Sequence, residues 1–242
     1  MRTILVIDDE RPTLKMFELY LGAYGYPVLT AASGEEGLAV FSQKAPPIVL
    51  TDIKMPGMDG LAVLRAIKEQ SPRTEVIVVT GHGDVDLALS ALGLRATDFI
   101  DKPIRREMLE AALARANARL DHAAGTGGGE AIAMTREGDV AVIAIPGGLT
   151  GESEPYLGRV LREADAAAKL LFAFSADATI NGAGLDLLLQ AVEDARGGGR
   201  PVALCGLSDN FAKVIARLGV TSRAPVFAGR REALRHLAAG PA

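Results

Sequence analysis

The chain has 242 residues, of which 49% are hydrophobic and 23% charged, with no Trp and a single Cys. This is the composition of a soluble globular protein, and the length fits one large domain or two small ones. The 26 basic residues against 30 acidic ones leave a net charge of −4. That balance argues against a strongly basic protein that binds nucleic acid.

Cysteine usage and the chain's start both point to a cytoplasmic protein. The lone Cys205 has no partner for an intramolecular disulfide, so nothing indicates an oxidising compartment. The acidic residues at positions 8–10 come too early for a signal peptide. No apolar run approaches the length of about 20 residues that a membrane helix needs, so we expect no membrane association.

Short apolar runs alternate with segments of helical period through the first half of the chain. Because the runs are almost entirely apolar, they predict strands that are covered on both faces, as in a parallel sheet wound with helices. The predicted strands are 3–7, 28–31, 48–51, 76–80 and 98–100, and the predicted helices are about 12–24, 34–43, 59–70, 84–94 and 105–121.

Residues 123–129, Ala-Ala-Gly-Thr-Gly-Gly-Gly, have no side chain that could anchor them to a core. We interpret them as a flexible linker between a domain at 1–122 and a domain at 130–242. An ordered phosphate-binding loop is disfavoured because no Lys-Ser/Thr pair follows the glycines. Residues 1–122 have 14 basic and 17 acidic residues, and residues 123–242 have 12 basic and 13 acidic ones, so neither half is a basic module.

Polar and charged residues stand where the predicted strands of the first half end. The functional crevice of such a sheet lies at the carboxyl ends of its strands, and these positions hold Asp8, Asp9, Asp52, Thr80 and Lys102. Clustered carboxylates repel one another and raise one another's pKa values, so a cation has to join them. Mg²⁺ suits oxygen ligands best, and Lys102 neutralises part of the charge. The acidic pair taken alone could also be a solvated helix cap.

Four segments of the first half carry a family resemblance. They are ILVIDDE at 4–10, LTDIKMPGMDG at 50–60, VTGHG at 79–83 and DFIDKP at 98–103. With them, residues 1–122 resemble the receiver domain of two-component response regulators. The resemblance implies a flavodoxin-like, doubly wound sheet of five parallel strands. It also implies a histidine kinase or phosphotransfer protein as the partner that donates the phosphoryl group.

The resemblance also implies a role for each matching residue. Asp52 is the phosphoacceptor, Lys102 binds the phosphoryl group, and Thr80 and Phe99 are the switch pair. The Lys102–Pro103 peptide bond is expected to be cis. Mg²⁺ is held by Asp8, Asp9, Asp52 and the backbone carbonyl of Lys54. Phe99 stands where many members have Tyr. From their places in these segments we expect Lys54 and His82 to flank the path of attacking water. The alternative is that both are surface residues with no role.

The residue types suit this chemistry. A carboxylate is a weak nucleophile, so Asp52 accepts a phosphoryl group only if Mg²⁺ and Lys102 neutralise the transferred oxygens. The Thr80 hydroxyl can then move toward the phosphoryl group and vacate space for the Phe99 ring, which gives the domain two packings.

A haloacid-dehalogenase-type phosphatase also combines a nucleophilic Asp with a Thr, a Lys and Mg²⁺. That chemistry needs a second Asp two residues after the nucleophile as general acid and base. Lys54 stands at this position. We therefore expect no turnover enzyme, only self-catalysed phosphoryl transfer to Asp52 and its hydrolysis.

The second half begins with a predicted hairpin, strands 131–135 and 140–145 around the turn Glu137-Gly138-Asp139. The alternation that follows predicts a small mixed sheet with helices packed on one side. The further strands are 170–174, 201–205 and 225–227, and the helices are about 152–168, 183–196, 209–218 and 230–239.

Three segments, IPGGLT at 145–150, INGAGL at 180–185 and VALCGL at 202–207, make this half similar to the STAS domain of anti-sigma-factor antagonists. Phosphorylatable members read Asp-Ser-Ser-Gly-Leu in the second segment. Here the acid and both hydroxyl residues are replaced, so no phosphate ester can form. We predict a constitutive protein-docking surface at Asn181, Gly182, Ala183, Gly184 and Leu185. The alternative is that the glycines only allow tight packing.

Together these features predict a cytoplasmic response regulator. Histidine-kinase phosphorylation of Asp52 would control a STAS output domain that binds a protein partner, with an anti-sigma factor as the type implied. The alternative is a phosphorelay or scaffold protein whose STAS half is a localisation or small-ligand sensor module. Nucleic-acid binding is disfavoured because no recognition-helix module is left over. The oligomeric state stays open, a homodimer included.

Overall fold

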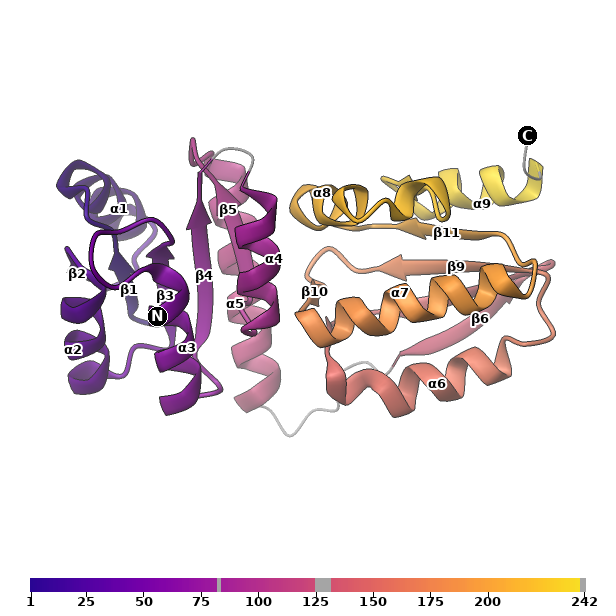
Figure 1. Cartoon of the computed structure of the whole chain (residues 1–242), viewed down its shortest axis with the longest axis horizontal. Helices are drawn as coiled ribbons and strands as arrows, with labels where there is room; N and C mark the ends of the chain where they lie inside the picture. Colours follow the sequence, from indigo (N-terminus) through magenta and orange to yellow (C-terminus); the bar gives the residue numbers. More distant parts are fainter. Residues whose placement is uncertain (82–83, 125–131, 240–242) are drawn as a thin grey trace. The chain divides into compact units, whose positions relative to one another are not determined.

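The computed structural model describes residues 1–81, 84–124 and 132–239. The chain divides into two compact units, Met1–Thr126 and Gly127–Ala242 (Figure 1). Of the predicted linker 123–129, only residues 123 and 124 are described, at the end of a helix, and the rest lies outside the described residues. The linker and the domain limits at 122 and 130 stay predictions.

The first unit is a doubly wound parallel sheet, as the sequence predicts. Its strand order is β2-β1-β3-β4-β5, the flavodoxin-like order, in which the direction of winding changes between β1 and β3. The strands are β1 (Ile4–Ile7), β2 (Val28–Ala31), β3 (Ile48–Asp52), β4 (Glu75–Thr80) and β5 (Asp98–Asp101). The helices are α1 (Arg11–Ala23), α2 (Gly34–Lys44), α3 (Gly60–Gln70), α4 (Val85–Gly93) and α5 (Arg106–Ala124).

The apolar strands of this sheet are buried on both faces. On one face, Ile4, Val6 and Leu50 form a core with Phe17 of α1 and Leu113 of α5. The alternate side chains point to the other face, where the glycine at position 37 lets α2 lie directly against Ile7. Because side chains fill both faces, polar groups reach a common edge only where the strands end.

The second unit contains a mixed sheet in the order β12-β11-β9-β7-β6, and a separate pair of short strands, β8 and β10. The strand β6 is antiparallel to β7, which confirms the predicted hairpin. The strands are β6 (Ala133–Glu137), β7 (Val140–Ile145), β8 (Gly148–Leu149), β9 (Lys169–Phe174), β10 (Thr179–Ile180), β11 (Val202–Cys205) and β12 (Val226–Phe227). The α-helices are α6 (Glu154–Glu163), α7 (Gly182–Gly197), α8 (Asp209–Arg217) and α9 (Arg230–Ala239), with 3₁₀ turns at Gly151–Ser153 and Val220–Ser222.

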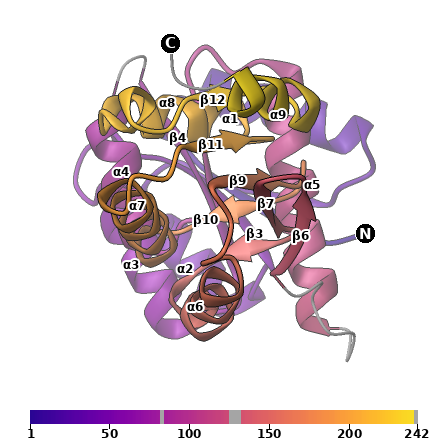
Figure 2. The same ribbon diagram turned by 90° about the vertical axis from the view of Figure 1, so that its right-hand side faces the viewer.

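Helices cover both faces of this mixed sheet, whereas the sequence led us to expect them on one side. Ala233 and Leu237 of α9 pack in one cluster with Val142 and Leu171. The opposite face, which includes the fully buried Phe172, lies on the side of α6 and α7 (Figure 2). The reason is that α9 carries its own apolar stripe, which has to be buried against a sheet face. Among the described helices, none combines the length and apolar character that a membrane span requires.

Candidate functional site

The fold gathers the predicted acidic residues at one edge of the first sheet. Asp8 directly follows β1, Asp52 is the last residue of β3, and Lys102 directly follows β5. Since β1 and β3 are parallel neighbours, their carboxyl ends meet at the point where the winding direction changes. The carboxylates of Asp8 and Asp52 are buried, with residue exposures of 1% and 5%, while Asp9 is exposed.

The Lys102 ammonium joins the two buried carboxylates. Its Nζ lies 3.2 Å from Asp52 Oδ1 and 3.4 Å from Asp8 Oδ2. The Lys102–Pro103 peptide bond is cis, as the resemblance implied. Three side chains from distant parts of the sequence therefore form one charged cluster.

This cluster is poor in positive charge. Burial raises the pKa of Asp52 above its ordinary value, against the lowering effect of Lys102, and the charges of Asp8 and Asp9 raise it further. Burial likewise raises the pKa of Asp8. Burial opposes the charged form of Lys102, but the Asp52 and Asp8 carboxylates outweigh it and raise the pKa of this ammonium. With three carboxylates facing one ammonium, a further cation stabilises the site.

The donor set fits Mg²⁺. Within the described residues, no three acidic, His or Cys side chains are arranged to enclose a metal by themselves. Mg²⁺ does not require that, because it retains several waters and is usually bound by one or two carboxylates together with phosphate oxygens. Asp8 and Asp52, with Asp9 at the rim, can supply those carboxylates.

In the structure the predicted switch residues Thr80 and Phe99 are found with the hydroxyl bonded and the ring buried. The Thr80 hydroxyl donates to Asp101 Oδ1 at 3.2 Å, and the Phe99 ring is only 1% exposed. Asp101 is a residue that sequence reasoning did not single out, although it stands between Phe99 and Lys102 in the DFIDKP segment. Its carboxylate holds the hydroxyl that the predicted switch would move.

One further predicted position, Lys54, lies at the rim of the site. Lys54 forms an ion pair with Asp84, whose Oδ2 is 2.6 Å from the Lys54 Nζ. His82, the other residue expected to flank the path of water, lies outside the described residues. The structure therefore gives Lys54 a partner that the sequence did not indicate.

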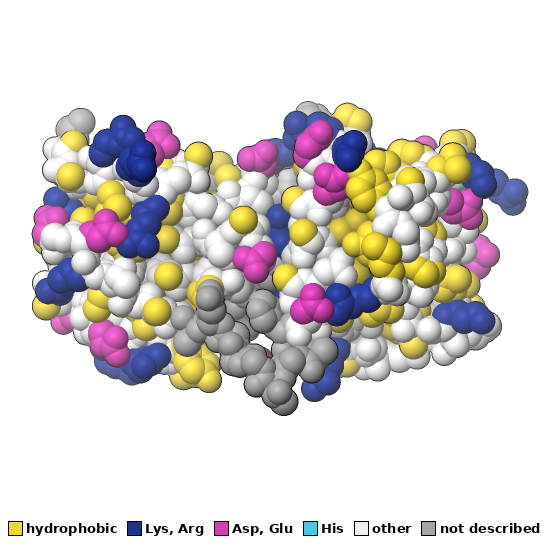
Figure 3. Space-filling model, turned by 180° about the vertical axis from the view of Figure 1, so that it is seen from behind, with side chains coloured by type: hydrophobic (Ala, Val, Ile, Leu, Met, Phe, Trp, Pro, Cys, Tyr) yellow, Lys and Arg dark blue, Asp and Glu magenta, His cyan; other side chains and the backbone are white. Residues whose placement is uncertain are grey.

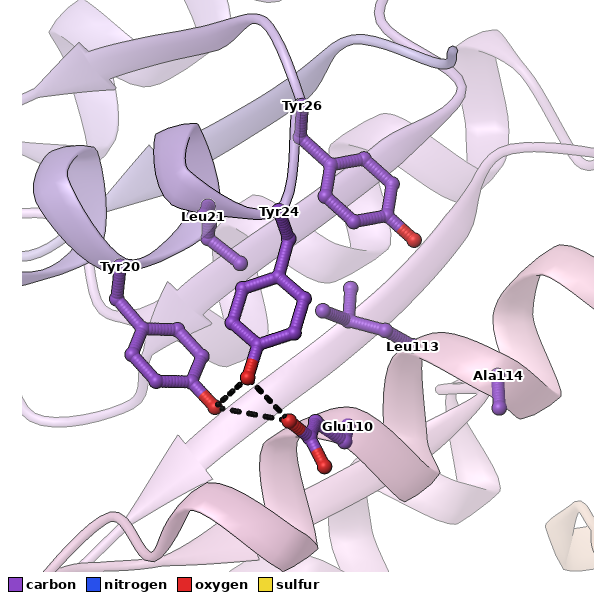
Figure 4. Close-up of a pocket in the computed structure, with 7 residues that line it drawn as sticks. All are labelled: Tyr20, Leu21, Tyr24, Tyr26, Glu110, Leu113 and Ala114. Atoms are coloured by element: carbon purple, nitrogen blue, oxygen red, sulfur yellow. Dashed lines mark hydrogen bonds between the residues drawn. The ribbon is translucent and has the colours of Figure 1, made fainter.

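A pocket of about 130 Å³ lies between α1 and α5 and is separate from this site. In Figure 4 the hydroxyls of Tyr20 and Tyr24 point toward Glu110, to which they donate at 3.3 Å and 2.6 Å. Tyr26, which also lines the pocket, comes just before β2 begins. The pocket therefore lies toward the amino ends of the strands, whereas the acids lie at the carboxyl ends.

The predicted docking segment of the second unit is largely occupied with packing. The Asn181 side chain caps α7 by accepting from the Gly184 amide at 2.8 Å. A Cβ at position 184 would lie 1.9 Å from the Leu149 carbonyl oxygen, so only glycine fits there. Leu185 is buried, Gly182 is half-buried, and Ala183 is exposed. Partner binding by these five residues stays a prediction.

A parallel sheet with buried acids at the β1 and β3 ends and a Lys after β5 is the arrangement that the receiver-domain resemblance implied. Comparison with known families agrees. Residues 4–114 match the response regulator receiver domain, and residues 131–233 match the STAS domain. The chain thus belongs to the response regulator receiver family in its first unit and to the STAS family in its second.

Individual relatives are similar over part of their length. The chain is 41% identical over 100 residues to the DNA-binding transcriptional regulator NtrC of Salmonella typhimurium, covering 41% of this chain and 21% of that protein. It is 41% identical over 114 residues to the C4-dicarboxylate transport transcriptional regulatory protein DctD of Rhizobium meliloti, covering 47% and 25%. A receiver domain structure from Clostridium thermocellum is 39% identical, covers 50% of this chain and 98% of that one, and has a TM-score of 0.49. The chain thus spans a quarter or less of these two curated relatives.

The raised pKa of Asp52 gives a prediction about stability. Because the pKa of Asp52 is higher in the folded state than in the unfolded state, ionisation of this carboxyl destabilises the fold. The cost is fully present at pH values above the folded-state pKa and is absent below the ordinary value of 3.8. Asp52→Asn should therefore raise the Tm of the first unit at pH 7, and the gain should shrink as the pH falls toward 3.8. Thermal unfolding in EDTA over this pH range measures it. A variant that melts below the parent at pH 7 would contradict the argument.

Proposed function

We propose that the chain is a two-component response regulator that is phosphorylated on Asp52 and controls a protein contact of its STAS domain. The observation that carries this proposal is the Lys102 ammonium between the buried carboxylates of Asp52 and Asp8. Receiver-domain homology supports a histidine kinase or a phosphotransfer protein as the donor.

The proposed reaction is a phosphoryl transfer to carboxylate oxygen. An Asp52 Oδ attacks the phosphorus of a phosphohistidine, the O–P bond forms as the P–N bond breaks, and the electron pair stays on the imidazole nitrogen. Lys102 stays beside the acceptor and neutralises the transferred oxygens, while Asp8 and Asp9 at the neighbouring strand end are available as metal ligands. Mg²⁺, when bound, supplies further charge neutralisation at those oxygens. Hydrolysis reverses the modification: water attacks phosphorus, the Asp52 carboxylate leaves, and inorganic phosphate is released.

The second unit supplies the output in this proposal. Because Asn181, Gly182 and Ala183 offer no hydroxyl group, control by serine phosphorylation at this helix start is excluded, and control falls to the receiver. The surface supports a protein partner over nucleic acid. On the face drawn in Figure 3, basic and acidic side chains are interspersed, without a continuous basic surface among the described residues shown. The proposed setting is the cytoplasm.

Labelling tests the receiver half of the proposal. Acetyl phosphate with Mg²⁺ should transfer its phosphoryl group to the full chain, and EDTA should reduce this labelling by at least about a hundredfold, the scale expected for losing a catalytic metal. Phosphate-affinity electrophoresis of the intact protein measures the labelled fraction. A chain that acetyl phosphate and a phosphohistidine donor both fail to label with Mg²⁺ present would overturn the proposal.

A binding experiment tests the output half. The full chain should bind a candidate anti-sigma factor with an affinity that changes in the presence of the phosphoryl mimic beryllofluoride. The reason is that the mimic stabilises one of the two receiver packings over the other and so shifts their populations. Isothermal titration with and without the mimic measures the difference. Binding of equal strength under both conditions would refute receiver control and favour a scaffold role.

A further inference from the structure

An ion pair bridges two loops at the rim of the acidic site. Lys54 lies in the loop after β3, two residues beyond Asp52, and Asp84 lies after β4, four residues beyond Thr80. The Lys54 Nζ and the Asp84 Oδ2 are 2.6 Å apart. Since β3 and β4 are neighbouring parallel strands, the pair joins their two loops next to the proposed phosphoacceptor.

Asp84 is also the N-cap residue of α4, but its side chain does not cap the helix. Aspartate is among the best N-cap residues because its carboxylate accepts from the amides of the first turn. Elsewhere in the same unit the rule is followed, since Asp59 accepts from the Ala62 amide at 2.8 Å and Ser33 accepts from the Glu36 amide at 3.2 Å. The Asp84 carboxylate is therefore diverted from a cap to Lys54.

The residue at position 81 makes room for this arrangement. A Cβ on Gly81 would lie 2.8 Å from Asp84 Oδ2 and 3.9 Å from the Lys54 Nζ. Any larger residue would press on the carboxylate in its present place. The ion pair is thus built from three positions in two loops.

We propose that Asp84 is a positioning residue whose carboxylate exchanges partners on phosphorylation. While Asp52 is unmodified, Asp84 holds the Lys54 ammonium at the rim. When the phosphoryl group adds negative charge two residues away, Lys54 moves to it and the Asp84 carboxylate turns to cap α4. This inference rests on the proposed function and adds a direct link from the phosphoryl group to α4.

The exchange is physically easy in this structure. The Lys54 side chain is 63% exposed and the Asp84 side chain 28%, so solvent weakens their attraction and both can rotate. A lysine is a flexible stem with a point charge, and a phosphoryl group with its higher negative charge competes well for it. In the phosphorylated state Lys54 pairs with the phosphoryl group and the Asp84 carboxylate pairs with an amide of α4. The first turn of α4 is therefore more stable when Asp52 is phosphorylated.

Amide hydrogen exchange in the full chain, followed by NMR, tests the proposal at the amide of Asp86, in the first turn of α4, where an N-cap carboxylate bonds. The Leu87 amide already donates to the Asp84 backbone carbonyl at 3.1 Å and serves as the internal reference. In the parent protein, beryllofluoride with Mg²⁺ should raise the protection factor of the Asp86 amide about fivefold, which corresponds to an N-cap worth about 1 kcal/mol. Lys54→Met frees the Asp84 carboxylate, so in this variant the Asp86 amide should already be protected without the mimic. Asp84→Asn should behave in the same way, because Asn caps well but forms no ion pair.

The controls separate this exchange from a merely structural role. Asp84→Ala should show low protection in both states, whereas general loosening of the loop would lower protection in Lys54→Met as well. A parent protein that binds the mimic without a change at the Asp86 amide, or a Lys54→Met variant in which this amide is protected only with the mimic, would overturn the proposal. Failure of both acetyl phosphate and a phosphohistidine donor to label the parent would instead remove the proposed function itself.

Discussion

Replacing Asp52 by Asn should abolish labelling of the chain by acetyl phosphate or by a phosphohistidine donor. Asn has the same shape as Asp, but its amide is not a nucleophile toward phosphorus, and the attacking carboxylate oxygen is lost. Because Asp52 is buried, the variant keeps the packing at the end of β3. We expect the labelled fraction to fall below detection, measured by phosphate-affinity electrophoresis of the full chain.

The matched control is Asp59→Asn in the same segment of the chain. Asp59 is exposed and caps α3 through the Ala62 amide, a role that Asn fills nearly as well. Labelling of this variant should equal that of the parent. Retained labelling in Asp52→Asn, mapped by peptide mass spectrometry to another acid, would show that Asp52 is not the acceptor.

The strand and helix pattern could be predicted because it follows from apolar periodicity. The predicted strand 140–145 is β7 (Val140–Ile145), and the predicted helix 230–239 is α9 (Arg230–Ala239). The two-residue strands β8 (Gly148–Leu149) and β10 (Thr179–Ile180) were not predicted, because they are too short to show a periodicity, although the equally short β12 lies within the predicted strand 225–227. The predicted helix 152–168 is shorter in the structure, where α6 ends at Glu163. Beyond it the amide of Ala167 donates to the carbonyl of Ala164 in a turn, which the run of small residues did not reveal.

The strand-end residues of the site were predictable for a topological reason. Parallel strands of one sheet bring their carboxyl ends together, so Asp8, Asp52 and Lys102 converge whatever the details of packing. The ion pairs of Lys54 with Asp84 and of Arg115 with Asp98 were not predicted, because loop and helix side chains meet through tertiary packing. Position 115 did offer a signal. An arginine there stands among the buried residues of α5, the last helix of the first unit, one residue before the fully buried Ala116.

Replacing Arg115 by Met should cost the first unit about 3–5 kcal/mol of unfolding free energy, the range for removing one partner of a buried ion pair. Arg115 is 4% exposed and Asp98 is fully buried. The Arg115 Nε donates to Asp98 Oδ2 at 2.7 Å, and the Arg115 Nη2 donates to the same oxygen. Without the guanidinium, the carboxylate stays buried without its cationic partner. Urea unfolding followed through the amide NMR signals of the first unit measures the loss, since whole-chain signals combine two units.

Two further variants isolate the buried charge as the cause. In the double variant Asp98→Asn with Arg115→Met, the amide oxygen can still accept from the Phe99 amide, as Asp98 Oδ1 does at 2.9 Å, but no charge is buried. It should therefore recover much of the lost stability. Arg106→Met, on the same helix in an exposed pair with Glu110, should change the unfolding free energy of the first unit little. Equal losses for Arg106→Met and Arg115→Met, or no recovery in the double variant, would show that lost side-chain packing on α5 is the cause. In that case the buried ion pair of Arg115 with Asp98 would not be what holds α5 against the sheet.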